Sequence, residues 1–335
     1  MPGSPSPVPS SGPAGPALRA WWAERPPAAG AAVMATGILS IALHLAGHEG
    51  LSRVMLALAG AGWVGLAADF VLRLVRERER WLSEASTPGG LTAVAATTVL
   101  GTCLSTLGWP VPAAALLAVA AVLWPVLLLR VMRHWTRRMP GAVFLCCVAT
   151  EGLAVLAATL AAEELTEWLA HAALVLFWLG LVLYVPMLAR FDPRQVTEGG
   201  GDQWVAGGAL AISALAGTKL IAADSPQMYL WNVDDEHVLR TVTIALLVLA
   251  LGWYAVLLVA EIVRPRPRFD VRRWATVFPM GMTAAALLSA VPALGIDWPE
   301  RLGEVLLWVA VAVWLAVAVA AALAARATIG AAGPR

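Results

Sequence analysis

Hydrophobic residues recur along the chain in long runs, without the short alternation that marks a half-buried strand. Ten such runs are separated by polar or charged stretches, and most contain about twenty residues. A run of that length crosses a hydrocarbon core roughly 30 Å thick as a helix. We therefore predict ten membrane-spanning helices, at 28–46, 51–74, 90–107, 112–133, 141–162, 168–190, 203–222, 238–262, 272–294 and 303–325.

The odd-numbered segments differ from the even-numbered ones in side-chain size. Odd segments carry glycine, serine and threonine, whereas even segments are dominated by leucine, valine, alanine and tryptophan. Small residues let helices approach closely or line an aqueous path, and broad aliphatic surfaces face lipid. The pattern predicts an all-α polytopic membrane protein of five consecutive helical hairpins. In this arrangement the odd helices form an inner ring and the even helices an outer one.

Positive charge gathers in the connections that follow even segments and at the two chain ends. The chain has 23 lysines and arginines, and the exceptions to this pattern are Arg53, Lys219, Arg240 and Arg301. The positive-inside rule then puts both termini in the cytoplasm. Composition agrees with a membrane protein, because 60% of the residues are hydrophobic and 13% are charged, against about a quarter charged in soluble proteins.

The chain divides into one membrane domain and two tails. We expect a disordered cytoplasmic tail at 1–25, which is rich in proline near its start, a ten-helix domain at 26–326, and a short cytoplasmic tail at 327–335. Cys103, Cys146 and Cys147 lie inside apolar runs, so no disulfide framework is indicated. There is no paired-histidine metal motif, nucleotide loop or soluble domain. We therefore expect no enzyme activity, no cofactor, no metal and no nucleic-acid partner.

Segment nine carries residues that a plain membrane anchor avoids. Pro279 has no N–H and frees the carbonyl of Ala275, while Gly281 removes a side chain and Thr283 adds a hydroxyl. A membrane helix tolerates such a break where protein or a water-filled path satisfies the backbone. Phe278 puts an apolar ring at this point. We predict that segment nine lines a pore, with Phe278 and Pro279 at the break in the helix.

Polar residues on the other odd segments are further candidates for the pore lining. An ionisable group deep in a membrane costs at least ~2.5 kcal/mol on insertion scales, which singles out Glu151 and Lys219. Two alternatives remain open: the two form an ion pair or line the outer vestibule, or Lys219 reaches the outer surface while Glu151 is protonated and hydrogen-bonded. The lining candidates are Thr36, Gly37, Ser40, Thr98, Thr150, Glu151, Ser213, Lys219, Gly281 and Thr283.

Two other charged pairs lie near helix ends. Asp69 precedes Arg73 by four residues, and Glu261 precedes Arg264 by three. Both spacings put the two side chains on one helix face. We interpret them as interfacial pairs.

Four motifs occur in an order that resembles the tellurite-resistance/dicarboxylate transporter family, which includes the plant guard-cell slow anion channels. Val33–Ser40 is similar to a V-M-x-T-G-x-x-S opening, and Val148–Leu156 to V-A-T-Q-S-L-A-V-L. Trp204–Ala216 resembles W-x-x-x-G-A-L-A-I-S-x-L-A, and Trp274–Gly281 resembles W-x-x-T-F-P-x-G. Two positions differ from the family pattern: Thr276 lies one position early, and Glu151-Gly152 replaces a frequent Gln-Ser.

The resemblance implies a fold and a gate. It implies ten helices as five hairpins with quasi-five-fold symmetry, inner helices kinked around a central pore, and a homotrimer. It also implies that a phenylalanine on the ninth helix, here Phe278, occludes the pore. The expected function is membrane transport of small inorganic or organic anions through a phenylalanine-gated pore, as an anion channel or channel-like exporter.

A second function stays open. In this alternative the chain is a proton-coupled carrier for a C4-dicarboxylate, sulfite or a tellurite-type oxyanion, with Glu151 as the proton site. Such a carrier needs two cationic contacts at mid-membrane, and this sequence offers only Lys219. A lining without rings of fixed charge suits anion passage controlled by dehydration and a mechanical block. The bias toward alanine, valine and arginine predicts a bacterial inner (plasma) membrane.

Overall fold

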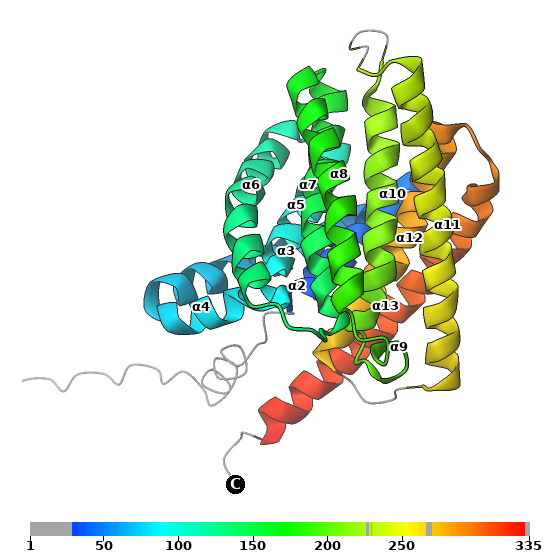
Figure 1. Ribbon diagram of the computed structural model, residues 1–335. Coiled ribbons are helices and arrows are strands. Elements are labelled where there is room, and N and C mark those ends of the chain that lie inside the picture. The colour runs from blue at the N-terminus through cyan, green and yellow to red at the C-terminus, as the bar shows by residue number, and fades with distance from the viewer. Residues whose placement is uncertain (1–28, 226–227, 229, 266–269, 332–335) are drawn as a thin grey trace, which may run out of the picture.

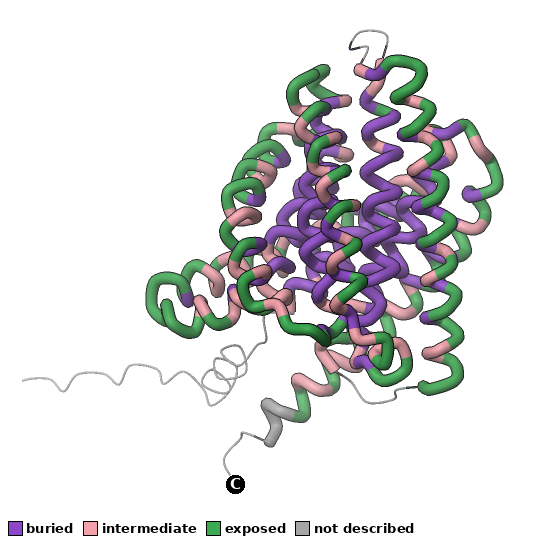
Figure 2. Tube along the Cα trace, viewed as in Figure 1, coloured by how far each residue is buried: buried purple, intermediate pink, exposed green. Residues whose placement is uncertain are grey.

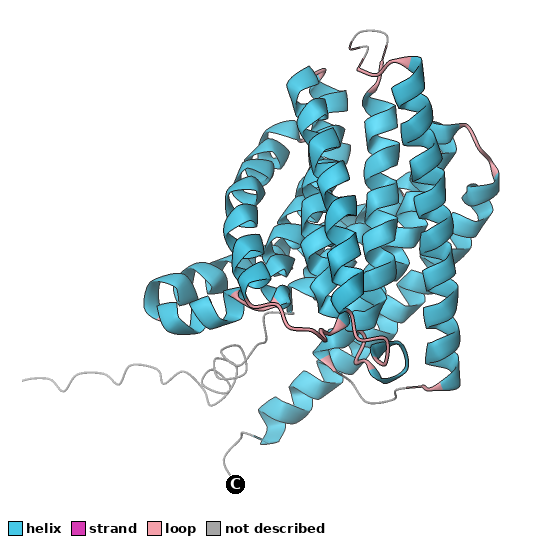
Figure 3. Ribbon diagram, in the orientation of Figure 1, coloured by secondary structure: helices cyan, strands magenta, loops and turns pink. Residues whose placement is uncertain are grey.

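The computed structural model of the protein describes residues 29–225, 228, 230–265 and 270–331. Within these ranges the chain is almost wholly helical, and the only strand-like pairing is one isolated bridge between Met139 and Phe191 (Figure 3). The long helices are α2 (Gly30–Leu45), α3 (Glu49–Arg76), α5 (Thr92–Thr106), α6 (Pro110–Arg133), α7 (Leu145–Glu164), α8 (Glu167–Arg190), α10 (Val205–Ala223), α11 (Val233–Val263), α12 (Trp274–Leu294) and α13 (Trp298–Ala331). Two short helices, α4 (Arg78–Ala85) and α9 (Gln195–Glu198), lie in connections.

Each predicted segment corresponds to one long helix. Of the described residues, nine helices are long and apolar enough to span a membrane. The tenth, α2, has 16 residues, about 24 Å at 1.5 Å per residue, and is therefore shorter than a typical core. The protein is a polytopic membrane protein, as predicted. The predicted tail at 1–25 lies outside the described residues, and the tail predicted from 327 begins as helix, because α13 continues to Ala331.

Burial separates the long helices into two sets. The apolar stretch of α7 is 100% buried, and those of α10 and α12 are 83% buried, whereas that of α3 is 11% buried. Figure 2 shows the buried helices in the middle of the molecule and exposed surface around them. Large aliphatic side chains such as Val64, Val122 and Val182 are more than half exposed on the outer set. An apolar surface this extensive belongs against lipid.

We call α2, α5, α7, α10 and α12 the inner helices, and α3, α6, α8, α11 and α13 the outer helices. Each inner helix packs against the outer helix that follows it in the chain. The inner helices also pack on one another in chain order, and α12 packs back on α2 (Figure 1). The inner set is therefore closed on itself.

Tryptophans on outer helices are hydrogen-bonded to threonines on inner helices in three places. The indole N–H of Trp63 on α3 donates to Thr97 Oγ1 on α5 at 2.9 Å, and that of Trp124 on α6 donates to Thr150 Oγ1 on α7 at 2.9 Å. Trp314 on α13 donates in the same way to Thr36 Oγ1 on α2 at 3.0 Å. In each case the bond runs from the outer helix of one hairpin to the inner helix of the next. A buried indole N–H needs an acceptor, and these threonines supply it.

Most of the described arginines lie at one end of the bundle, where α4, α9 and the end of α13 are found (Figure 1). Arg73 Nε lies 2.9 Å from Asp69 Oδ2, which confirms that predicted pair, and Arg73 also binds Glu84 on α4. The second predicted pair is wrong, because Glu261 pairs with Arg273 and not with Arg264. The 3₁₀ turn Val271–Arg273 that precedes α12 brings Arg273 to this carboxylate.

Asp270 caps that 3₁₀ turn. Its Oδ1 accepts from the Arg272 N–H at 2.9 Å, and its Oδ2 lies 2.8 Å from Arg272 Nη2. Hydrogen bonds from the Arg272 side chain hold the pKa of Asp270 below its usual value. The pair fixes the start of α12, the helix that carries the candidate gate.

Candidate pore and gate

Helix α12 continues through Pro279 without interruption. The sequence led us to expect a break there, but the helix is assigned from Trp274 to Leu294. The carbonyl of Pro279 accepts a hydrogen bond from Thr283 Oγ1 at 2.9 Å. The ring of Pro279 lies against α10 at Gly208, where an added Cβ would come within 2.8 Å of Pro279 Cγ. Gly208 thus provides the space that lets α12 and α10 pack at the proline.

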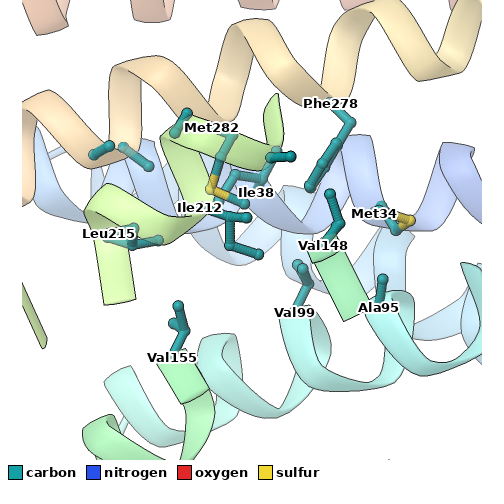
Figure 4. Packing of buried hydrophobic residues seen from close by; sticks show 14 of the residues in the cluster. Met34, Ile38, Ala95, Val99, Val148, Val155, Ile212, Leu215, Phe278 and Met282 are labelled. Carbon is teal, nitrogen blue, oxygen red and sulfur yellow. The ribbon is translucent and has the colours of Figure 1, made fainter. Parts of the chain in front are cut away.

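Phe278 points from α12 into the interior of the inner ring. Figure 4 shows its ring directed towards Val148 on α7, with Met34 on α2 and Ala95 on α5 close by. Phe278 is 1% exposed, and all of these neighbours belong to the same buried apolar cluster. The side chains are contributed by helices far apart in sequence. Phe278 therefore occupies a position where the inner helices converge.

Beyond Phe278 the inner helices enclose a small cavity of about 10 Å³. All five contribute to its wall, through Ile38, Ile41, Thr98, Val99, Thr102, Gly152, Val155, Ile212, Leu215 and Met282. A space of this size holds about one water molecule. Its wall is apolar except for two threonines. This stretch of the axis is therefore narrow and poorly suited to a hydrated ion.

The residues along the axis repeat at helical spacing. On α12, Phe278 is followed four residues later by Met282; on α2, Met34 is followed by Ile38. Side chains four residues apart lie on one face of a helix. The sequence did not predict these apolar residues as axis-facing, because every face of each inner helix carries apolar or small residues and no face differs from the others. The sequence signal for these residues is the spacing of four positions between apolar side chains, as in Phe278 and Met282 or Met34 and Ile38.

Several predicted lining residues direct their hydroxyls away from this axis. Thr36 and Thr150 accept from tryptophans on outer helices, and Ser40 lies 3.2 Å from Ser52 Oγ on α3. These hydrogen bonds tie the inner helices to the outer ones. Thr98 is the predicted hydroxyl that borders the small cavity.

The two predicted glycines serve helix packing. An added Cβ at Gly37 would come within 2.6 Å of Val99 Cγ1 on α5. An added Cβ at Gly281 would lie 3.0 Å from Ile38 Cγ2 on α2. Both positions keep neighbouring inner helices close together.

Glu151 is wholly buried between three helices. Its Oε1 accepts a hydrogen bond from Ser213 Oγ on α10 at 2.9 Å, so the structure brings these two predicted residues together. An added Cβ at Gly180 on the outer helix α8 would collide with the Glu151 carboxylate. The side chain therefore points outwards from α7, towards α8, and Gly152, the next residue, borders the small cavity instead.

Lys219 lies on α10 six residues beyond Ser213, towards the end of the bundle that carries few arginines. It is partly buried, and its charge interacts with that of Glu163 at the end of α7. Glu163 also accepts from Ser105 Oγ on α5. Among the described residues, no ion pair joins Lys219 to Glu151. In the part of the chain that the structure describes, no three His, Cys, Asp or Glu residues are grouped to hold a metal ion.

Comparison with known proteins gives the family. A family model described as SLAC1, voltage-dependent anion channel, matches residues 24–322, which include all the inner helices. A search of curated proteins finds no match. The match confirms the resemblance carried by the four motifs. The chain belongs to the SLAC1 family of voltage-dependent anion channels.

Proposed function

We propose that the protein conducts small anions along the axis of the inner ring and that Phe278 is the gate. One observation carries the proposal: a fully buried phenylalanine lies among apolar side chains from several inner helices, one helical turn before Met282, which borders a cavity of about 10 Å³. An ion at this point would lose its water without gaining a ligand, so an apolar constriction is a barrier to it. Moving one aromatic ring would widen the path.

The repeated contacts support a pore with approximate five-fold symmetry. The hairpins α2–α3, α5–α6, α7–α8, α10–α11 and α12–α13 each contribute one inner helix. The same type of indole-to-threonine bond joins three successive pairs of hairpins. We infer five quasi-equivalent units around one axis, with Thr98 and the apolar residues of the small cavity as its lining.

A channel fits the described residues better than a proton-coupled carrier. Glu151, the proton site that a carrier would use, is bonded to Ser213 and packed on Gly180, away from the axis. Lys219 lies beyond it towards the end of α10, so mid-membrane offers no pair of cations for a dicarboxylate. Transport of malate, sulfite or tellurite by a carrier mechanism is the second candidate. The family is one of channels and transporters, so catalysis is not part of the proposal.

The setting of the channel is also proposed. The arginine-rich connections favour an orientation with both termini in the cytoplasm. Residue composition favours a bacterial inner membrane, and the family resemblance favours a homotrimer with one pore in each copy. Detergent-free mass measurement of the assembly tests the last point directly.

The experiment is anion flux through purified protein in liposomes, with chloride, nitrate and malate in turn. We expect a small wild-type leak and an increase of about tenfold or more in Phe278→Ala, which corresponds to a barrier lowered by ~1.4 kcal/mol. Phe177→Ala is the matched control, because Phe177 is also fully buried but lies on the outer helix α8. Equal flux in all three proteins, with malate uptake only under a proton gradient, would reject the channel and support the carrier.

A further inference from the structure

A large apolar pocket opens on the outside of the inner ring, separate from the axis. Helices α3 and α6 form its sides, α5 forms its back, and α4 together with the turn Pro88–Leu91 closes one end. Its volume is about 700 Å³. Ligand sites in proteins span about 300–1,000 Å³, so the pocket is large enough to hold a molecule.

The wall of the pocket indicates an apolar occupant. Leu66, Phe70 and Leu123 line it, with Ala93 and Ala96 at the back. The charged residues at its closed end are already paired with one another, since Arg73 binds both Asp69 and Glu84. Arg80 also binds Glu84 at 3.0 Å, so two arginines balance the two carboxylates, and a ligand meets hydrocarbon along the wall.

The position of the pocket selects the occupant. Val71 and Val122, which line it, are 54% and 70% exposed on helices that face the bilayer. The medium outside the pocket is thus lipid, whose hydrocarbon chains are the apolar molecules at highest concentration. An empty space of this size would forfeit the dispersion contacts of its lining atoms. We propose that the pocket binds one hydrocarbon chain of a bilayer lipid, entering between α3 and α6 from the arginine-rich side.

The bound chain would lie one helix away from the pore. Ala96 and Thr97 of α5 face the pocket, while the next residues, Thr98 and Val99, border the small axial cavity. Trp63 also lines the pocket and donates to Thr97 Oγ1 at 2.9 Å. The chain therefore supports α5 from its outer side. This site follows from the packing of α3, α5 and α6, and it does not depend on the role of Phe278.

Photo-labelling of the full-length protein tests the site. The protein is reconstituted in phosphatidylglycerol–phosphatidylethanolamine vesicles in which a small fraction of the lipid carries a diazirine on an acyl chain, and adducts are mapped by peptide mass spectrometry. We expect adducts on pocket-lining residues of α3 and α6 to exceed those on the exposed faces of α8 and α11 by about fivefold, the ratio that ~1 kcal/mol of added contact gives.

Pocket-filling variants make the test specific. Ala67→Trp on α3 and Ala118→Trp on α6 each put an indole into the pocket, and we expect either to lower the enrichment about fivefold. Ala255→Trp, on the exposed face of α11, is the matched control and leaves the labelling unchanged. Elution volume and chloride flux establish that each variant is folded.

Three results would overturn the proposal. Uniform labelling of all outer helices would mean that lipid only coats the surface. Enrichment that neither tryptophan reduces would place the chain elsewhere. Enrichment can also be absent in the full-length protein and emerge only after deletion of residues 1–28, or pocket residues of two copies can form cross-links. Either result would mean that a protein segment, and not a lipid chain, occupies the pocket.

Discussion

The Glu151 carboxylate and the Ser213 hydroxyl meet at 2.9 Å between α7 and α10, on the side of α7 that faces α8. The hydrogen bond joins two adjacent inner helices in the depth of the membrane. Val148, three residues before Glu151 on α7, is the residue of this helix towards which the Phe278 ring is directed (Figure 4). The Glu151 carboxylate is thus engaged in contacts between helices, with Ser213 on α10 and with Gly180 on α8.

This relationship predicts a small effect of Glu151→Gln on conduction. The glutamine carbonyl accepts the same bond from Ser213, and the side chain stays off the axis. In a Phe278→Ala background we expect chloride flux to stay within about twofold of the parent, less than ~0.5 kcal/mol of barrier, at pH 6 and at pH 8. Loss of a pH-gradient-driven malate uptake in the glutamine variant would instead identify Glu151 as a carrier's proton site.

Gly180→Ala should destabilise the fold. The new methyl group collides with the Glu151 carboxylate, and overpacking costs about 1–3 kcal/mol. Gly252→Ala on α11 is the control, because nothing lies within 4 Å of an added Cβ there. Thermal unfolding in detergent measures both. Adding Glu151→Ala should relieve the defect, and an unrelieved defect would contradict the contact.

The indole-to-threonine bonds should be measurable as pairwise couplings. In a cycle of Trp314→Phe and Thr36→Val we expect a coupling of ~0.6 kcal/mol, the average for hydrogen bonds between membrane helices. The same value is expected for Trp124 with Thr150. Pairing Thr36→Val with Trp168→Phe, an exposed tryptophan on α8, should give additive effects. Coupling in that control pair as well would show that the threonine acts through general packing.

Asp270→Asn should lower stability in a pH-dependent manner. Because Arg272 lowers the folded-state pKa of Asp270, the charged pair stabilises the fold above the unfolded pKa of about 3.9 and this contribution is lost as pH falls through the lower folded value. We expect a constant, small difference between wild type and variant from about pH 5 to pH 8, shrinking below about pH 4. A difference that grows on acidification has the wrong sign for this pair.

Which helices lie inside could be predicted from the sequence, but the facing of their side chains could not. The contrast between Thr- and Gly-containing segments and leucine-rich ones separates α5 or α7 from α6 or α8, because the buried helices carry the small side chains and the exposed helices carry the large aliphatic ones. Within an inner helix, however, every face is buried, so Thr36 and Thr98 look alike. The hydroxyl of Thr36 also donates to Ala32 O at 2.8 Å, and such local bonding lets threonine face an apolar partner as easily as a pore.

A clue to the facing of these threonines was present in the outer segments. Trp63, Trp124 and Trp314 each lie inside an apolar run, where an indole N–H has no water to bond. Pairing each of them with a hydroxyl of the next odd segment would have assigned Thr97, Thr150 and Thr36 to the inter-ring layer. Met34 and Val148, the apolar residues near Phe278, have no polar group that requires a partner, so the sequence alone does not reveal which way they face.

The contact of α13 with α2 has a consequence for biosynthesis. A chain inserted into the membrane from its N-terminus releases α2 first, yet the partner of Thr36 is Trp314, 278 positions later. The face of α2 that packs against the last hairpin therefore stays without its protein partner in the bilayer until α13 has been inserted. Truncation of α13 would therefore leave α2, the first helix of the bundle, without the indole that binds Thr36.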